Sequence, residues 1–286
     1  MNPIIFAWIA SITFGLYSIV AKLIGTYQLK NSYQFSFFAT LFGGMLMSSI
    51  AYANGGRLAT SWSFIVLAAI FLALGNALYL ASLKVLDVSV MAPLFNVRVV
   101  ITVMLGVLLL GETLSTQSLS IICLIIIAGF FATMDERFSF KSFFSGSIGL
   151  GLLFMLLLSL QSIFINRAID QTNYWTAILW MSLLAIGFSF VFLYPKFKKD
   201  LAQSSVKDYA GVGLLAFIGG VGDLAAYKAY AGNVGISSVI ISLPISMVLA
   251  FILSLWKPTL MEKHSFKVYG VRFAAAAVMI WGALQL

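Results

Sequence analysis

The sequence is short of charge, cysteine and histidine, and these shortages exclude several classes of protein. Only 9% of the 286 residues are charged, whereas a soluble domain has about 25%. With one cysteine (Cys123) and one histidine (His264), the chain has no internal disulfide and no Cys/His metal site. It also lacks the Gly-x-x-x-x-Gly-Lys-Ser/Thr motif, so ATP has no P-loop to bind. We expect no metal and no cofactor.

What the sequence has in excess is apolar surface, since 62% of its residues are hydrophobic. So few polar residues cannot cover a protein in water, and the surrounding solvent is therefore lipid. A bilayer-spanning helix takes roughly 20 residues, and the chain divides into ten apolar stretches of about that length. Their approximate bounds are 3–24, 32–53, 62–84, 88–110, 115–134, 146–168, 173–194, 208–230, 236–257 and 266–285. Continuous rather than alternating apolar runs exclude a β-barrel.

The connectors between these stretches are short and leave no room for a soluble catalytic or ligand-binding domain. The net charge of +8 therefore lies on no exposed domain, and we expect no nucleic-acid partner. Residues 1–24 are interpreted as a retained first helix, because the run is too long for a signal-peptide core and lacks a basic start. The prediction is an all-α, integral, multi-pass membrane protein in contact with the lipid bilayer.

Basic residues predict an orientation, because short loops rich in Lys and Arg favour the cytoplasm. We call the side that holds the N-terminus side A and the opposite side side B. Side B would hold Lys22, Lys30, Lys84, Arg137, Lys141, Lys196, Lys198, Lys199, Lys207, Lys257, Lys263 and Lys267, and side A would hold Arg57, Arg167 and Lys228. This distribution predicts a cytoplasmic side B and two outward-facing termini.

An internal repeat is visible in the order of features along the chain. Residues 79–89 align with residues 227–237, and each segment is followed by an apolar stretch that a proline interrupts, Pro93 and Pro244. Because five helices is an odd number, a second five-helix half enters the membrane from the opposite side. Such inverted repeats are typical of alternating-access transporters. We therefore predict ten transmembrane helices as two inverted five-helix repeats, residues 1–142 and residues 143–286.

Short motifs add a family resemblance to this repeat. They are the Leu-Leu-Leu-Gly-Glu-Thr-Leu-Ser run at 108–115, the helix end at 79–84 that leads into Ser89, the Ala128-Gly129 pair and Lys22. In these features and in helix number the chain resembles the ten-helix EamA-type members of the drug/metabolite transporter superfamily. The resemblance implies metabolite transport, favours export, and implies cytoplasmic termini, the reverse of the orientation from charge. We expect a bacterial inner (plasma) membrane location. The second-repeat turn departs from the family pattern, since Glu262 follows methionine instead of glycine.

Two charged residues fall deep inside predicted spans, Arg98 in the fourth and Asp223 in the eighth. A charge at mid-membrane costs a few kcal/mol, so each marks a candidate functional site. Helical spacing places Phe95 and Thr102 on the face of Arg98, and Tyr227 on the face of Asp223. The predicted substrate-binding set is Arg98, Asp223, Asn76, Tyr79, Phe95, Thr102, Tyr227 and Ser242. Glu112, three residues before Ser115, is expected to order its turn and the helix start that follows.

Two interpretations of the deep charges remain open. Arg98 would attract an anionic group of a small-molecule substrate, with Asp223 as counter-ion or proton carrier; alternatively, the two form an ion pair that only fixes helix packing. An enzyme is not expected, because Asp223 is the only deep carboxylate and has no catalytic partner. The predicted function is secondary, non-ATP transport of a small polar or amphipathic metabolite by alternating access, with protons as the candidate coupling ion. The alternative is a channel, or a non-transporting membrane scaffold or assembly protein.

Overall fold

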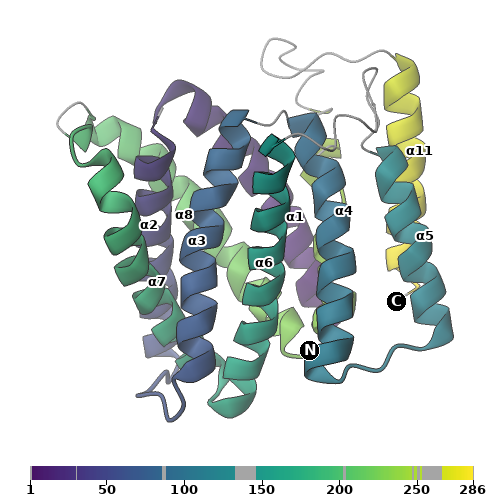
Figure 1. The fold of residues 1–286 in the computed structure, drawn as a ribbon, viewed down its shortest axis with the longest axis horizontal. Helices are drawn as coiled ribbons and strands as arrows, with labels where there is room; N and C mark the ends of the chain where they lie inside the picture. Colours follow the sequence, from purple (N-terminus) through teal and green to yellow (C-terminus); the bar gives the residue numbers. More distant parts are fainter. Residues whose placement is uncertain are drawn as a thin grey trace.

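Long α-helices make up the structure (Figure 1), a computed structural model that describes residues 2–29, 31–85, 88–132, 146–201, 204–246, 248–249, 252 and 266–285. The helices are α1 (Pro3–Tyr27), α2 (Ser32–Ala53), α3 (Ser63–Val85), α4 (Val88–Leu105), α5 (Thr116–Ala132), α6 (Gly146–Gln171), α7 (Tyr174–Phe197), α8 (Val206–Tyr230), α9 (Val234–Ile241) and α11 (Phe266–Ala283). A π-helical segment, η1 (Gly106–Leu110), continues α4. The described residues contain no strand. The all-α prediction is confirmed, and each predicted stretch contains one of these helices.

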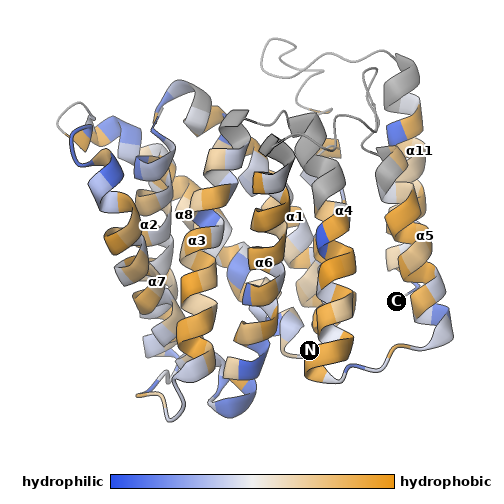
Figure 2. Cartoon of the chain, viewed as in Figure 1, coloured by the Kyte–Doolittle hydropathy of each residue, from blue (hydrophilic) through white to orange (hydrophobic). Residues whose placement is uncertain are grey.

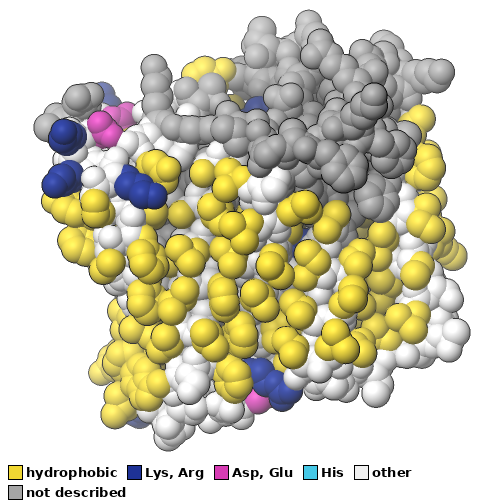
Figure 3. All heavy atoms as spheres, in the orientation of Figure 1, with side chains coloured by type: hydrophobic (Ala, Val, Ile, Leu, Met, Phe, Trp, Pro, Cys, Tyr) yellow, Lys and Arg dark blue, Asp and Glu magenta, His cyan; other side chains and the backbone are white. Residues whose placement is uncertain are grey.

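Several helices have the length and apolarity that a bilayer requires. Five qualify among the described residues: Pro3–Gly25, Ser32–Ala53, Gly149–Gln171, Tyr174–Phe197 and Val206–Tyr230. Figure 2 shows the middle of the bundle as mainly hydrophobic along the helices. Figure 3 shows hydrophobic side chains over the middle of the visible face and charged ones gathered at its two ends. The protein is thus an integral, multi-pass membrane protein, because such a surface is stable in lipid and not in water.

Asparagine side chains set the beginnings of four helices. Asn2, Asn31, Asn173 and Asn233 immediately precede α1, α2, α7 and α9, and each side chain accepts a hydrogen bond from a backbone N–H of the first turn. The first N–H groups of a helix have no partner within the helix, and a short polar side chain at this position satisfies them. These helix starts are therefore determined by local sequence.

The two prolines of the predicted repeat have different effects. Pro93 does not interrupt α4, which runs through it from Val88 to Leu105. The α-helical pattern changes only at Gly106, where η1 begins, and the segment ends at Gly111 with a φ of 71°. Pro244 does mark an interruption, because α9 ends at Ile241 and helical residues resume at Ile245. The ninth span is therefore discontinuous, with α9 as a short separate piece.

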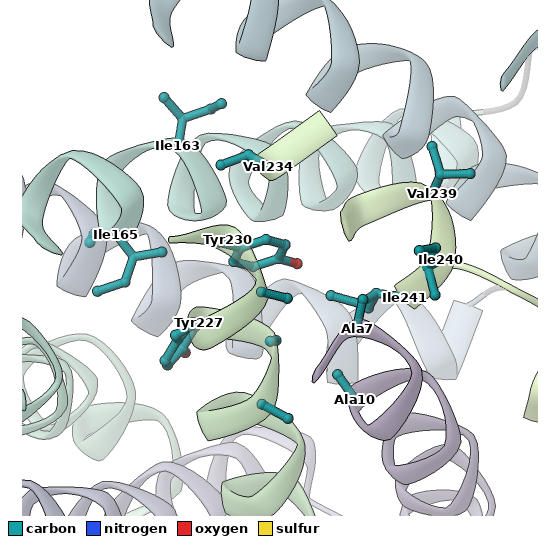
Figure 4. Packing of buried hydrophobic residues seen from close by; sticks show 14 of the residues in the cluster. Ala7, Ala10, Ile163, Ile165, Tyr227, Tyr230, Val234, Val239, Ile240 and Ile241 are labelled. Atoms are coloured by element: carbon teal, nitrogen blue, oxygen red, sulfur yellow. The ribbon is translucent and has the colours of Figure 1, made fainter. Parts of the chain in front are cut away.

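Helix pairs from opposite halves of the chain pack against each other. The strongest pairings are α2 with α7, α3 with α6, α1 with α8 and α5 with α11 (Figure 1). Close to the centre, α4 packs on α6 and on α9, and α9 also packs on α1. The largest buried apolar cluster lies where these elements meet, and Figure 4 shows part of it with Tyr230 of α8 near Val234 of α9. The predicted repeat boundary at residues 142–143 lies outside the described residues.

Candidate functional site

Arg98 lies on α4 inside the bundle, with 4% of its surface exposed. One guanidinium nitrogen, Nη2, donates to the Ser162 hydroxyl on α6 at 3.2 Å and to the Tyr230 hydroxyl on α8 at 2.9 Å. Its Nε is buried and has no hydrogen-bond partner. The charge is therefore held by two neutral hydroxyls, both bonded to Nη2, and the Nε–H donor is left without an acceptor.

Thr102 and Asn166 hold the surroundings of this arginine in place. Thr102, fully buried one turn after Arg98, donates within α4 to the Arg98 carbonyl at 2.9 Å and reaches Ser159 Oγ of α6 at 2.8 Å. The Asn166 side chain of α6 donates to the Tyr230 carbonyl at 2.6 Å. Both sides of the guanidinium site, α4 and the end of α8, are thus hydrogen-bonded to α6.

Three more predicted residues lie on the α3 and α4 faces beside α6 and α2. The half-buried Tyr79 and Phe95 both contact Phe154 of α6, with ring centroids 5.2 Å and 6.3 Å apart. Asn76 donates from Nδ2 to Thr40 Oγ1 of α2 at 3.2 Å. Tyr79 of α3 and Phe95 of α4 therefore contact the same aromatic side chain, that of Phe154. Asn76 bonds to a different helix, α2.

Asp223, the second deep charge, lies on α8. It is half-buried and makes no hydrogen bond or ion pair with the described residues. Tyr17 of α1, Tyr174 of α7 and Tyr227 of α8 lie near enough to interact with it electrostatically. The Tyr174 hydroxyl donates to the carbonyl of the adjacent Leu224 at 2.5 Å. The carboxylate thus faces tyrosines from three helices.

The alternative of an Arg98–Asp223 ion pair is not what the structure contains. Both residues are described, Arg98 bonds to hydroxyls, and no ion pair joins it to the carboxylate. Asp223 precedes Tyr230 by seven residues on α8, which is a rise of about 10.5 Å along the helix. Arg98 and Asp223 therefore do not contact each other directly. Tyrosines link their surroundings, since Tyr17 interacts electrostatically with Tyr79 and Asp223, and Tyr227 interacts with Asp223 and with Tyr230, the partner of Arg98.

Ser242, the last residue of the predicted set, does not lie on a helix. It falls in the break after α9, and its hydroxyl is buried without a hydrogen-bond partner. The Ser238 hydroxyl, one turn earlier, is likewise buried and unpartnered. Among the described residues no three His, Cys, Asp or Glu side chains come together as a metal site requires. The α9 segment and the break after it therefore carry two buried hydroxyl groups, of Ser238 and Ser242, that have no hydrogen-bond partner.

The predicted substrate-binding set contains no residue of α6, yet this helix completes the arginine site. Its Ser159 and Ser162 both contact the arginine segment, and Phe154 contacts Tyr79 and Phe95. A usable signal was present, because Met155, Ser159, Ser162 and Asn166 follow the same four-three-four spacing as the residues around Arg98. Small polar residues at such spacing in a membrane helix favour contacts with another helix.

Glu112 corrects another prediction. It was expected to order the start of α5, but Ser115 caps that helix, accepting from the Ser118 N–H at 3.0 Å. The Glu112 carboxylate instead accepts from the backbone N–H groups of Val234 at 2.5 Å and Gly235 at 3.0 Å, at the start of α9. The partner helix is more than a hundred residues away in sequence, so local pattern gave no sign of it.

Comparisons with known proteins agree with this architecture. Residues 1–134 match the EamA-like transporter family, which confirms the resemblance to the drug/metabolite transporter superfamily. A search of curated proteins finds no match. Among solved structures 28 chains match. One, described only as a crystal structure of a protein, is 15% identical with a TM-score of 0.71, and the alignment covers 98% of this chain and 94% of that chain. At that identity the likeness concerns the fold alone.

Proposed function

Since residues 1–134 belong to the EamA-like transporter family, we propose that this protein is a secondary transporter of a small polar or amphipathic metabolite. It works by alternating access and without ATP, because the sequence has no nucleotide-binding motif. Residues 1–142 and 143–286 are its two inverted repeats, it lies in a bacterial inner membrane, and its direction is export.

The main support for the proposal comes from the burial and hydrogen bonding of Arg98. A guanidinium inside a membrane bundle is costly unless something compensates its charge. Arg98 is buried, bonds only to the hydroxyls of Ser162 and Tyr230, and leaves Nε without a partner. A structural role alone would favour a carboxylate partner, so the free donor is interpreted as the place of an anionic substrate group.

Helix packing supports the inverted repeat. If α1–α5 correspond in order to α6–α9 and α11, then the α3–α6 pair corresponds to the α8–α1 pair, and both are among the closest pairings. In the same way α2 with α8 corresponds to α7 with α3, and α4 with α6 corresponds to α9 with α1. Pairs that correspond to themselves, α2 with α7 and α5 with α11, also pack closely. This pattern is expected of two halves related by a two-fold axis in the membrane plane.

Asp223 is the proposed proton carrier or counter-ion. Its carboxylate lies within the span Val206–Tyr230, is half-buried and has no hydrogen-bond partner among the described residues. Tyr227, one turn further along α8, is the proposed neighbour in this step. Tyr79, Phe95 and Asn76 would line the substrate path on the α3 and α4 side, with Thr102 supporting Arg98 and Ser242 offering its free hydroxyl.

The test is a ligand screen by thermal shift on the purified protein, followed by transport of the hit in proteoliposomes. We expect Arg98→Ala to abolish both the stabilisation by ligand and transport while the protein remains folded, because the anion-binding donor is gone. Arg57→Ala is the matched control, since that exposed loop arginine makes its contacts to Thr176 and Trp180 through its backbone. Transport that is unchanged in Arg98→Ala would overturn the proposal.

The same proteoliposomes separate a carrier from the alternatives. A carrier saturates with substrate and exchanges labelled for unlabelled substrate across the membrane, whereas a channel conducts without exchange. A scaffold shows neither ligand stabilisation nor flux. Asp223→Asn addresses coupling: we expect exchange to persist and acceleration by a proton gradient to disappear, and acceleration that survives would exclude Asp223 as the proton carrier.

A further inference from the structure

The carboxylate of Glu112 joins two elements from opposite halves of the chain. Glu112 follows η1 in the turn between α4 and α5, and its two oxygens accept the N–H groups of Val234 and Gly235. Hydrogen bonds from backbone N–H groups to a carboxylate are strong, and a negative charge at a helix N-terminus is favourable. One side chain therefore holds the beginning of α9 against the end of α4.

The first turn of α9 is completely satisfied by two side chains. Glu112 accepts from Val234 and Gly235, while the Asn233 side chain accepts from the Ile236 N–H at 2.7 Å. In most helices a single cap residue serves the first turn and water serves the rest. Since Val234 and Gly235 are buried, loss of Glu112 would leave two buried N–H groups without an acceptor unless α9 moves.

Two glycines make room for this carboxylate. A Cβ atom at Gly106 would lie 2.5 Å from Glu112 Oε2, and one at Gly235 would lie 2.9 Å from the same oxygen. The Glu112 backbone N–H also donates back to the Gly106 carbonyl at 3.2 Å, and Gly111 between them has the positive φ that glycine adopts at little cost. The turn therefore directs the Glu112 side chain to α9. A side chain in place of either glycine would collide with the carboxylate.

The α9 segment itself is short and separated from its neighbours at both ends. It has eight residues, follows the turn at Ala231–Gly232, and ends before the break at 242–244. It packs on α1 and α4 and carries the unpartnered hydroxyl of Ser238. On the other side of the contact, Arg167 of α6 donates to the Leu109 carbonyl of η1. The η1 side is therefore also bonded to α6, whereas α9 is a short buried piece that Glu112 joins to η1.

From these contacts we propose that Glu112 is a releasable latch, closed in this structure, that controls the movement of α9 at side A of the transport path. This inference rests on the proposed function, because alternating access requires that such a segment open and close. Releasing the two N–H groups frees α9 between its two breaks and exposes the Ser238 face. The latch is made by one side chain, which suits a contact that must break in every cycle.

The experiment measures exposure of Ser238 and needs no substrate. In a background in which the only cysteine is removed (Cys123→Ser), Ser238→Cys is combined with Glu112, Glu112→Gln or Glu112→Ala, and the rate of labelling by a small methanethiosulfonate is measured in proteoliposomes. We expect Glu112→Ala to raise the rate about tenfold or more, since two charge-assisted hydrogen bonds are lost. Glu112→Gln keeps one acceptor oxygen and should fall between.

Ser189→Cys on α7 is the matched control position. Ser189 is 1% exposed and its hydroxyl also lacks a partner, but it lies on α7, which bonds to the Arg57 backbone through Thr176 and Trp180. Its labelling should not change in Glu112→Ala. If Ser238→Cys is labelled equally in all three backgrounds, or if both positions become reactive together, Glu112 is a structural residue and the latch proposal is overturned. If transport is nevertheless intact in the Glu112 variants, only the latch proposal fails and the proposed function is unaffected.

Discussion

The α2–α7 pair and the α4–α9 pair are both contacts between the two halves of the chain, yet they are fastened in different ways. We call α2, α7 and the connectors at their ends the α2–α7 frame. At side B, the Gln34 side chain of α2 donates to Ser204 Oγ and to the Tyr209 hydroxyl, each at 2.8 Å. At side A, the Trp180 indole donates to the Arg57 carbonyl at 2.8 Å. The frame is thus bonded at both membrane surfaces.

Several further contacts reinforce the frame. The Arg57 backbone N–H donates to Thr176 Oγ1 of α7 at 3.1 Å, and the Ser61 hydroxyl bonds the α2–α3 connector to Gln171, at the end of α6, at 2.6 Å. At the opposite end, the Asn31 side chain donates to the Asp200 carboxylate. Each polar group in these contacts has a partner from a different helix or connector. Breaking the frame would require the loss of many bonds at once.

The α4–α9 region has fewer polar contacts between its elements, although buried hydroxyls without a partner also occur in the frame, at Ser36 and Ser189. The buried Nε of Arg98 and the hydroxyls of Ser238 and Ser242 have no partner, and the Glu112 latch is the main polar contact between the two elements. Buried polar groups are normally satisfied, and exceptions concentrate at functional sites. We therefore expect the α2–α7 frame to stay fixed during transport while the α4–α9 region changes its contacts. This difference predicts the stability of substituted proteins in the two regions.

The largest effect is expected from Gln34→Met in the frame. Gln34 is 2% exposed, and methionine keeps its length but removes the donor to Ser204 and Tyr209. We expect the free energy of unfolding to fall by about 2 kcal/mol, because two buried hydrogen bonds are lost and their partners stay buried. Thermal unfolding of the purified protein in detergent measures the change. Gln117→Met, at an exposed position on α5, is the control; equal losses in both variants would contradict a special role of the frame.

A smaller effect is expected where α2 and α7 approach most closely. A Cβ at Gly44 would lie 2.8 Å from two side-chain carbons of Ile186 and 3.2 Å from the Ser182 carbonyl oxygen. Gly44→Ala should therefore lower the free energy of unfolding by about 1 kcal/mol through overpacking. Gly187→Ala, on the neighbouring α7 position with nothing within 4 Å, should be neutral or stabilising. A frame that tolerates both substitutions would not be tightly packed.

The smallest effect is expected in the centre. Ser238→Ala removes a hydroxyl that has no partner, so the free energy of unfolding should change by less than about 0.5 kcal/mol. Ser159→Ala is the matched comparison, because its hydroxyl donates to the Met155 carbonyl at 2.9 Å and contacts Thr102; a loss of about 1 kcal/mol is expected there. If Ser238→Ala is the costlier of the two in thermal unfolding, the hydroxyls of α9 are structural and the comparison fails.

Much of the fold could be predicted because membrane insertion depends on local composition. The ten apolar stretches required only a count of about 20 residues per span, and the asparagines before α1, α2, α7 and α9 set helix starts through contacts within three residues. Arg98 and Asp223 were identified by their depth alone. Each of these inferences concerns a residue and its immediate neighbours.

The partners of these residues could not be predicted in the same way. Arg98 meets Ser162 and Tyr230, which are 64 and 132 positions away, and Glu112 meets the start of α9, 122 positions away. In a soluble helix the apolar face identifies the interior. In a membrane helix the faces toward lipid and toward protein are both apolar, so periodicity does not indicate which helix will be the neighbour.

Composition and residue order are enough to predict apolar helices that span the membrane and two charges deep among them, because the solvation of each residue depends on its own chemistry. The packed structure adds that Arg98 and Asp223 do not bond to each other, that α6 completes the arginine site, and that Glu112 caps a helix of the other half. Those outcomes depend on which helices pack together, and that choice is made by the shapes of whole surfaces.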